Sequence, residues 1–142
     1  MATIQLEVVS PNGQVCSKEI AMLIVRSTGG DLGILPRHAP LITGLVPHAM
    51  RVKLSGNQEE LIACAGGFME VTPQKITVLA NAAEEAGNID VNRAQAAYDR
   101  AKARIEEFKR APKDHVDIDI DRAELALARA KARLLVTGNS VN

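Results

Sequence analysis

The stretch IDVNRAQAAYDRAKAR, at Ile89–Arg104, returns 29 residues later as IDIDRAELALARAKAR, at Ile118–Arg133. Ten of the sixteen aligned positions are identical, and both copies close on RAKAR. Ala and Arg are strong helix formers, and the Asp at the second position of each copy suits a helix N-cap, because its carboxylate accepts backbone amides of the first turn. The repeat predicts two helices, from about Val91 to Lys109 and from about Ile120 to Val136.

A proline and a glycine indicate where these helices end. Pro112 lies in the polar segment between the copies and predicts a break, and Gly138 predicts the end of the second helix. Two helices joined by a short loop usually form an antiparallel hairpin. The eleven alanines between Ile89 and Val136 let helices approach closely but bury little apolar surface, so we expect a hairpin that docks weakly.

Arginines recur at the same spacing in both copies. The second and third fall seven and eleven residues after the first, along one stripe of each helix: Arg93, Arg100 and Arg104, then Arg122, Arg129 and Arg133. In an antiparallel hairpin, Arg93 and Arg100 come level with Arg129 and Arg133. Guanidinium groups at one end of a hairpin repel unless an acidic partner or an anion lies between them. A solvated basic face, or duplication of one helix without any ligand, explains the same pattern.

The first half of the chain differs in composition. Nine of the ten glycines and five of the six prolines precede Asn88. Met1–Asn88 holds six basic and eight acidic residues, against eleven and nine in the rest of the chain. These shifts indicate a change from a turn-rich to a helix-rich architecture at about Gly87–Asn88.

Strand patterns fill this first half. Ile4, Leu6 and Val8 alternate with other residues at period two, and short apolar runs follow with turn residues such as Gly66-Gly67 between them. The runs are Ala21–Val25, Met50–Leu54, Leu61–Ala65, Phe68–Val71 and Ile76–Leu79. The expected fold class is α+β: an antiparallel β-sandwich over residues 1–86, followed by an antiparallel two-helix hairpin over residues 87–142.

The least regular part of this half is GGDLGILPRHAPLITGLVP, at Gly29–Pro47. Its prolines at Pro36, Pro40 and Pro47 predict that neither a long helix nor a central strand forms there. The segment lacks the Gly-Lys-Ser/Thr ending of a phosphate loop. His38 is the natural candidate for chemistry, but no nucleophile with a plausible partner stands nearby in the sequence. A surface contact is the stronger interpretation.

The composition disfavours several classes of protein. Lys+Arg and Asp+Glu are equal at 17 each, which argues against a dedicated nucleic-acid binder. No apolar stretch is long enough for a membrane span, and the N-terminus lacks the pattern of a signal peptide. Cys16 and Cys64 form no CxxC pair and no metal-like group with the histidines, so we expect no metal site and two half-buried thiols in a reducing cytosol.

Three segments resemble the epsilon-subunit family of bacterial F-type ATP synthases. GDLGILPRHAPL (Gly30–Leu41) is similar to the loop signature of that family, and GGFMEVTPQKITVLA (Gly66–Ala80) to its last pair of strands. DIDIDRAELALARAKARL (Asp117–Leu134) is similar to its final helix. The resemblance covers nearly the whole chain in order. It implies a sandwich followed by a helical hairpin, in agreement with the residue patterns.

The resemblance implies a mechanical role, without catalytic residues in this chain. The sandwich would bind the gamma subunit of the central stalk and touch the ring of c subunits, coupling proton or sodium-ion flow to ATP synthesis. The c-ring contact would involve Asp31, Leu32 and His38, with Asp31 at the tip of a loop. The chain would lie on the cytoplasmic side of a bacterial plasma membrane, held there only through the complex.

The same resemblance implies a mobile hairpin that inhibits ATP hydrolysis. Extended along gamma, the hairpin would enter the alpha/beta catalytic head. Arg122, Arg129, Lys131 and Arg133 would meet an acidic segment of a beta subunit there. The segment Arg122–Asn142 carries four basic residues and one acidic residue, which suits such a contact.

Some members of that family bind one ATP in the folded hairpin through an I/L-D-x-x-R-A motif, which Ile89–Ala94 matches in full. Guanidinium groups suit phosphates, and Asp90 with backbone groups suits the base or the ribose. The implied site is Glu84, Ile89, Asp90, Arg93, Ala94, Arg100, Arg122, Arg129 and Arg133. This ATP would be a regulatory ligand, and no cofactor is required.

Two other functions stay open. One is a free-standing ATP-sensing module, for which the arginine cluster is the only support. Copurification with gamma and c-ring proteins would favour a stalk subunit over such a module. An enzyme is disfavoured, because no paired acid and base or activated nucleophile is evident in the sequence.

Overall fold

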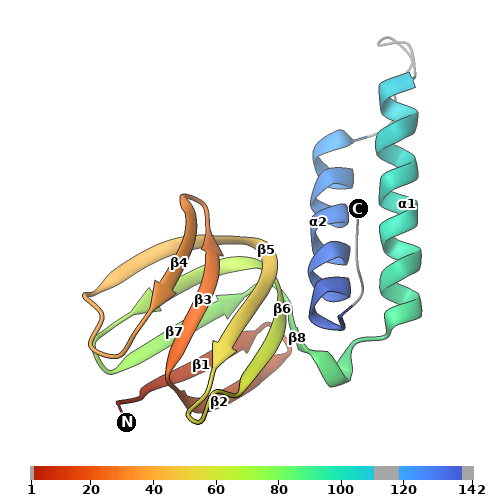
Figure 1. The fold of residues 1–142 in the computed structure, drawn as a ribbon. Coiled ribbons are helices and arrows are strands. Elements are labelled where there is room, and N and C mark those ends of the chain that lie inside the picture. Colours follow the sequence, from red (N-terminus) through yellow and green to blue (C-terminus); the bar gives the residue numbers. More distant parts are fainter. Residues whose placement is uncertain (1, 111–118, 139–142) are drawn as a thin grey trace.

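The computed structural model describes residues 2–110 and 119–138. A sheet of eight strands is followed by two helices, which confirms the expected α+β class (Figure 1). The strands are β1 Ile4–Ser10, β2 Gly13–Ile20, β3 Met22–Ser27, β4 Gly30–Ile34, β5 Leu41–Lys53, β6 Glu59–Val71, β7 Lys75–Ala80 and β8 Ala83–Glu85. The helices are the 3-10 turn η1 Ala86–Asn88, α1 Val91–Arg110 and α2 Ile120–Val136.

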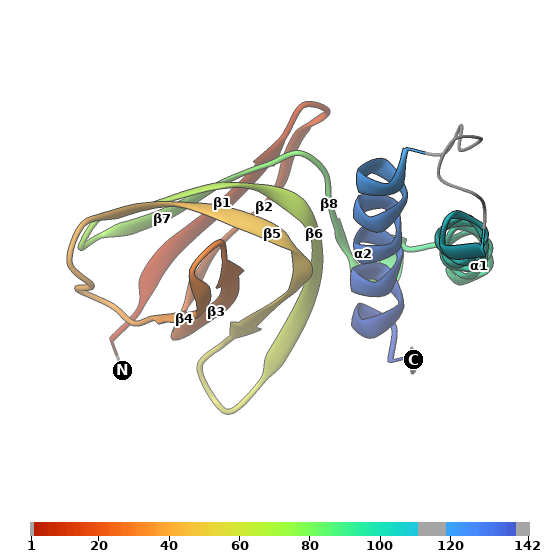
Figure 2. The ribbon, with the colours of Figure 1, turned by 90° about the horizontal axis from the view of Figure 1, so that it is seen from above.

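The strands form one hydrogen-bonded path in the order β2-β1-β7-β6-β5-β3-β4, with β8 paired to β6. Figure 2 shows this path curving round on itself, so that two layers enclose a core. Neighbouring strands pair antiparallel except β1 and β7, which are parallel. The side chains that fill the core are aliphatic and almost fully buried: Leu6, Ile20, Leu23, Ile34, Met50, Ile62, Met69 and Ile76.

Strand β5 corrects the expectation that no central strand forms within Gly29–Pro47. It lies between β3 and β6 and contains Pro47. Pairing of β5 with β3 is irregular between Ile24 and Ser27, opposite the stretch that holds Pro47. A proline donates no backbone hydrogen bond, and such a bulge is where a sheet tolerates one. Strand β4 was also not predicted, because it lies in the same segment rich in glycine and proline. It pairs with β3 alone, at the end of the path.

Gly66 and Gly67 do not form the expected turn but lie inside β6. Both have positive φ, 93° and 140°. At this point β6 changes partner, from β7 over residues 67–71 to β8 over residues 62–64. A Cβ on Gly67 would lie 2.1 Å from the carbonyl oxygen of Leu79, so the two strands approach too closely there for any side chain. The glycine pair is therefore a bend within one long strand.

The helix ends follow the sequence closely. Asp90 accepts the backbone N–H of Arg93 at 3.0 Å, and Asp119 accepts that of Arg122 at 3.1 Å, so both predicted N-caps are confirmed. After α2, Gly138 has φ 83° and donates its N–H to the carbonyl of Leu135, as left-handed residues at helix C-termini commonly do. The predicted break at Pro112 lies outside the described residues.

Helix α2 lies between the sandwich and α1, and Figure 2 shows the three layers in that order. A second apolar cluster, separate from the sandwich core, joins them. Its members are mostly small: Ala63, Ile89, Ala94, Tyr98, Ala130, Ala132, Leu134 and Val136, with Ala49, Leu61, Ala97 and Leu127 at its border. Within the described ranges, no helix is both long enough and apolar enough to cross a membrane.

Candidate functional site

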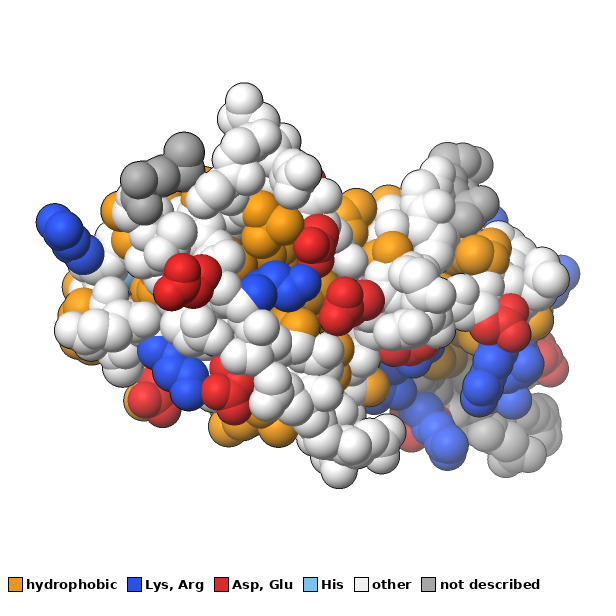
Figure 3. Space-filling view, turned by 90° about the horizontal axis from the view of Figure 1, so that it is seen from below, with side chains coloured by type: hydrophobic (Ala, Val, Ile, Leu, Met, Phe, Trp, Pro, Cys, Tyr) orange, Lys and Arg blue, Asp and Glu red, His pale blue; other side chains and the backbone are white. Residues whose placement is uncertain are grey.

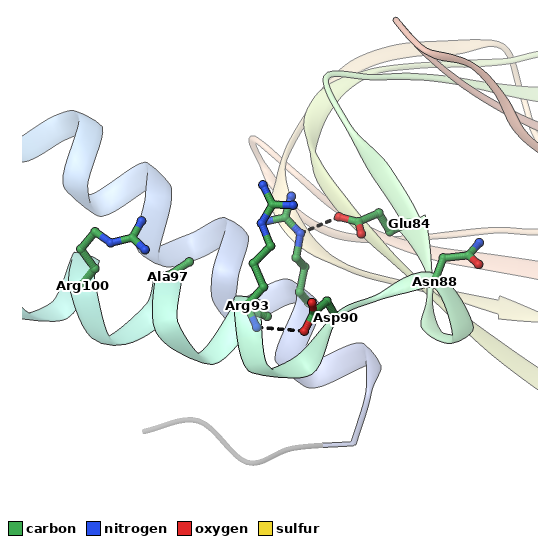
Figure 4. Close-up of a pocket in the computed structure, with 8 residues that line it drawn as sticks. Glu84, Asn88, Asp90, Arg93, Ala97 and Arg100 are labelled. Atoms are coloured by element: carbon green, nitrogen blue, oxygen red, sulfur yellow. Dashed lines mark hydrogen bonds and ion pairs between the residues drawn. The ribbon is translucent and has the colours of Figure 1, made fainter.

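A cavity of about 380 Å³ lies where the hairpin meets the last strand of the sheet. Its walls come from β8, η1, α1 and α2, which meet there because the hairpin folds back beside the sandwich. Figure 4 shows most of the lining side chains along the first turns of α1. They are Glu84, Asn88, Asp90, Arg93, Ala94, Ala97, Arg100 and Arg133.

Three guanidinium groups and two carboxylates face this cavity. Arg133 Nε of α2 donates to Glu84 Oε1 of β8 at 2.6 Å, and both side chains are about two-thirds buried. Asp90 uses Oδ1 for the helix cap. Among residues 2–110 and 119–138, neither Arg93 nor Arg100 has an ion-pair partner. Two uncompensated guanidinium groups thus line a concave surface, which favours an anionic ligand.

The floor of the cavity is formed by small residues that the helical period places on one face of α1. Ala94 and Ala97 lie one turn apart on α1 and present only methyl groups, so that side of the helix leaves room for a ligand. Arg93 and Arg100 are two turns apart, about 10 Å along the helix axis. The cavity is therefore an elongated trough, with cationic groups spread along it.

The structure brings six of the nine residues expected at an ATP site together around this cavity. They are Glu84, Asp90, Arg93, Ala94, Arg100 and Arg133. Arg129 lines a smaller adjoining cavity whose wall also includes Glu84 and Arg133. Ile89 is buried in the apolar cluster of the hairpin, where it anchors the start of α1.

Arg122 lies apart from the cavity. It is in the first turn of α2, eleven residues or about 16 Å of helix before Arg133. Since the helices are antiparallel, this turn comes level with the end of α1 rather than with its beginning. The second copy of the repeat therefore forms a second helix, but its first arginine does not contribute to the cavity as Arg93 of the first copy does.

Two lining residues were absent from the predicted set, Asn88 and Ala97. The helical period could have predicted Ala97 as a lining residue, because it lies on the same face of α1 as Ala94, one turn later. Asn88 precedes the N-cap by two residues and lies in η1, and Figure 4 shows its side chain directed away from α1. No periodic pattern in the sequence indicates this.

The residues expected to face the c ring lie on a hairpin formed by β3 and β4. Thr28 and Gly29 form its turn, so Asp31 is not at the tip as expected but pairs with Arg26 at 2.8 Å. The hydrogen bond from Arg26 lowers the pKa of Asp31. Leu32 packs against the sandwich core, whereas His38 is half-buried and follows β4.

The surface carries both signs of charge side by side. On the face drawn in Figure 3, basic side chains have acidic neighbours and apolar patches lie between them. The ion pairs of the sandwich surface include Lys18–Glu60 at 2.6 Å and Lys75–Glu7 at 2.8 Å. Two cations of the trough, Arg93 and Arg100, have no such partner among the described residues.

Comparisons with known proteins match this architecture. The family model for the ATP synthase delta/epsilon chain β-sandwich domain covers residues 3–86, and the model for the long α-helix domain of the same chain covers residues 88–138. The chain is 48% identical to the ATP synthase epsilon chain of Alkalihalophilus pseudofirmus over 114 residues, 80% of this chain and 85% of that one. It is 47% identical to the ATP synthase epsilon chain of Bacillus subtilis over 105 residues, 74% of this chain and 79% of that one.

A solved structure shares the fold. The match is to a chain in the Euglena gracilis mitochondrial ATP synthase, OSCP/F1/c-ring, with a TM-score of 0.77 at 19% identity, covering 98% of this chain and 83% of that chain. Sandwich, hairpin and family models together define the class: the chain belongs to the ATP synthase delta/epsilon chain family. Within that family, the bacterial relatives just described are all epsilon chains.

Proposed function

We propose that this chain is a non-catalytic epsilon subunit of the central stalk in a bacterial rotary ATP synthase, and that ATP regulates it by binding in the trough. Membership of the family supports the first part. The observation that carries the second is the trough itself, where the matched motif residues Asp90, Arg93 and Ala94 meet Arg100, Arg133 and Glu84.

The chemistry of the trough suits a nucleoside triphosphate. Arg93 and Arg100 are free to bind phosphate oxygens, and Arg133 adds a third guanidinium that is shared with Glu84. The ligand would contact α1, α2 and β8 together, so its binding would stabilise the docked hairpin. At a hundred times its dissociation constant, a ligand adds about 2.7 kcal/mol to the state that binds it. This is enough to shift a hairpin docked largely through alanines.

Calorimetric titration of the purified chain with ATP tests this role. Arg93→Ala removes a charge-assisted bond to phosphate and should weaken binding about ten- to a hundredfold. Arg104→Ala is the matched control, because Arg104 lies on the same helix, is exposed and does not line the trough. Equal binding by the Arg93→Ala variant and the wild type would contradict the proposed site.

Inhibition of ATP hydrolysis would follow from the undocked hairpin. Arg122, Arg129, Lys131 and Arg133 would then be available to an acidic surface of the catalytic head, since Arg133 leaves Glu84 on undocking. The test is ATP hydrolysis by the complex reconstituted with Arg129→Glu/Arg133→Glu. We expect the reversal to relieve inhibition, and unchanged inhibition would reject the contact.

An exposed apolar patch on the sandwich supports docking to the gamma subunit. Phe68 lies opposite both Leu79 and Gly44 in the sheet, and Ile42 is on the same face of β5. The exposed fractions of Ile42, Phe68 and Leu79 are 74%, 63% and 56%, which is unusual for three neighbouring large side chains. Phe68→Glu should weaken binding to gamma by at least about tenfold, with Val91→Glu on the hairpin as control.

Contact with the c ring would use Asp31, which is exposed beside the β3–β4 turn, and His38, which is half-buried beyond the other end of β4. Cysteines placed at these positions should crosslink to c subunits in the assembled complex. Absence of crosslinks from both positions would exclude a contact between this part of the sandwich and the c ring. Recovery of the chain free of gamma and c subunits, with ATP binding intact, would instead favour the free-standing sensor.

A further inference from the structure

A second groove, of about 310 Å³, opens on the sandwich itself. It lies where the start of β3 meets the β5–β6 turn and the residue that follows β4. Figure 1 shows the β5–β6 turn and the β3–β4 turn at opposite ends of the sandwich. The apolar side chains that line this Leu35 groove are Ala21, Met22, Leu35 and Leu54. The exposed patch around Phe68 does not line it, so the groove is separate from the surface proposed for gamma.

Leu35 is held on a braced turn, although its exposed fraction is 54%. His38 donates its N–H to the carbonyl of Leu35 at 3.2 Å, which closes a turn around Pro36–Arg37. The N–H of Arg37 donates to the carbonyl of Pro73 at 3.2 Å, so the turn is also bonded to the connection between β6 and β7. A large apolar side chain exposed from such a backbone suits a docking surface, because little order is lost when a partner binds.

Arg37 adopts a backbone conformation that costs free energy. Its φ is 66°, in the left-handed region that glycine enters without strain, and this position of such a turn usually holds glycine or asparagine. The side chain of Arg37 is exposed and has no ion-pair partner within residues 2–110 and 119–138. No contact among those residues explains a guanidinium where glycine fits better. Strain of this kind clusters at binding sites.

Lys53 gives the rim of the groove a positive charge. It lies opposite Glu59 in the pairing of β5 with β6, but the Glu59 carboxylate already accepts two hydrogen bonds from Arg51, at 3.0 Å and 3.2 Å. Two cations thus share one carboxylate. With Arg37 on the neighbouring turn, positive charge exceeds negative charge around the groove, so the surface attracts acidic groups.

We propose that the Leu35 groove docks a segment of another subunit in which an aliphatic or aromatic side chain stands beside a carboxylate; this rests on the proposed place of the chain in a rotary complex. The apolar side chain fills the groove against Leu35, and the carboxylate pairs with Lys53 or Arg37. Apolar contact supplies affinity, and the charge-assisted pair fixes the orientation of the segment.

Binding of full-length variants to the complex depleted of this chain tests the surface. Leu35→Ser should weaken binding on the order of tenfold, whereas the volume-conserving Leu35→Met should retain it. Lys53→Glu should also weaken binding, and Lys53→Arg should not.

Arg37→Gly distinguishes a binding role from a structural one. Glycine removes the strain together with the guanidinium, so the isolated chain should unfold at a higher urea concentration. Binding to the depleted complex should nevertheless weaken about threefold, the loss expected for one exposed ion pair. Higher stability with unchanged binding would remove Arg37 from the surface.

A photoreactive p-benzoyl-phenylalanine at position 35 in the assembled complex identifies the partner. We expect crosslinks to one segment of another subunit that places an Asp or Glu beside an apolar residue. An intact complex without crosslinks, or crosslinks only to a segment that lacks a carboxylate, would overturn the proposal.

The two proposals fail in different ways. If the wild-type chain does not bind the depleted complex, the stalk function fails, and the docking groove fails with it. If the wild type binds and Phe68→Glu weakens that binding, but Leu35→Ser and Lys53→Glu do not, only the docking groove is overturned.

Discussion

Arg133 on α2 and Glu84 on β8 form an ion pair with an Nε–Oε1 distance of 2.6 Å, 49 residues apart in the chain. It joins the hairpin to the sheet at the edge of the trough. Because both side chains are only about one-third exposed, the pair is less screened by water than the Arg26–Asp31 pair of the sandwich, whose side chains are 45% and 61% exposed.

The Glu84–Arg133 pair should stabilise docking of the hairpin. A double-mutant cycle with Glu84→Ala and Arg133→Ala should give a coupling free energy of about 1 kcal/mol, measured by hydrogen exchange of α2 amides without nucleotide. Glu85→Ala is the neighbouring control, because Glu85 lines a different cavity. Additive effects of the two substitutions would mean that the pair contributes nothing to docking.

Leu134 should be the main apolar anchor of the hairpin. It is fully buried in a cluster otherwise rich in alanine, so Leu134→Ala should cost about 2–5 kcal/mol of docking free energy. Hydrogen exchange of α1 and α2 should accelerate while the sheet stays protected. Leu135→Ala, at a 38% exposed position, should change docking by less than about 0.5 kcal/mol. Unfolding of the sheet in step with the helices would show that the two parts are not separable.

Gly67 should tolerate no side chain. Gly67→Ala forces a Cβ against Leu79 at a backbone φ of 140°, and we expect a loss of at least about 3 kcal/mol in the free energy of unfolding, measured with urea. Gly56→Ala has the same sign of φ but open space around the Cβ, and should cost only about 1 kcal/mol. Similar costs for both would mean that β6 and β7 can separate at the bend.

His48 should make the sandwich sensitive to mild acid. Burial lowers the pKa of His48 below its usual value of 6.5, the nearby Arg26 guanidinium lowers it further, and Asp31 opposes the shift. The unfolded chain therefore binds the proton more readily. The contribution of His48 to stability is complete above pH 6.5 and declines as the pH falls toward the folded pKa.

Urea titrations between pH 7.5 and pH 5 check this sign. The free energy of unfolding should fall with decreasing pH, with a slope from this one group of at most about 1.4 kcal/mol per pH unit. His48→Gln should flatten the dependence over that interval. An NMR titration in which the His48 ring protonates above pH 6.5 in the folded chain would contradict the prediction.

Local patterns in the sequence predicted the helices well and the sheet less well. The second helix was expected at Ile120–Val136 and lies there, because Asp119 and Gly138 each define an end by a local hydrogen bond. By contrast, β5 and β6 run through Pro47 and Gly66-Gly67. These residues stop an isolated strand, but a bulge and a change of partner accommodate them in the folded sheet, and both depend on contacts between distant segments.

The candidate site was predictable to the extent that it lies on one helix. The stripe that contains Arg93 and Arg100 follows from the period of α1, and the placing of Arg133 beside them follows from an antiparallel hairpin. The separation of Arg122 also follows from that geometry, although the family resemblance had implied that Arg122 belongs to the site. Asn88 depends on the path of a short 3-10 turn, which no repeat or period in the sequence encodes.

The trough has walls from β8, η1 and both helices, so it exists only while these elements keep their places. Withdrawal of α2 from β8 removes one wall and with it every contact that spans the gap. A ligand held by all of the walls has to leave before the hairpin opens. Its dissociation rate then sets the shortest time for which the hairpin stays closed, and occupancy of the trough becomes a measure of elapsed time as well as of concentration.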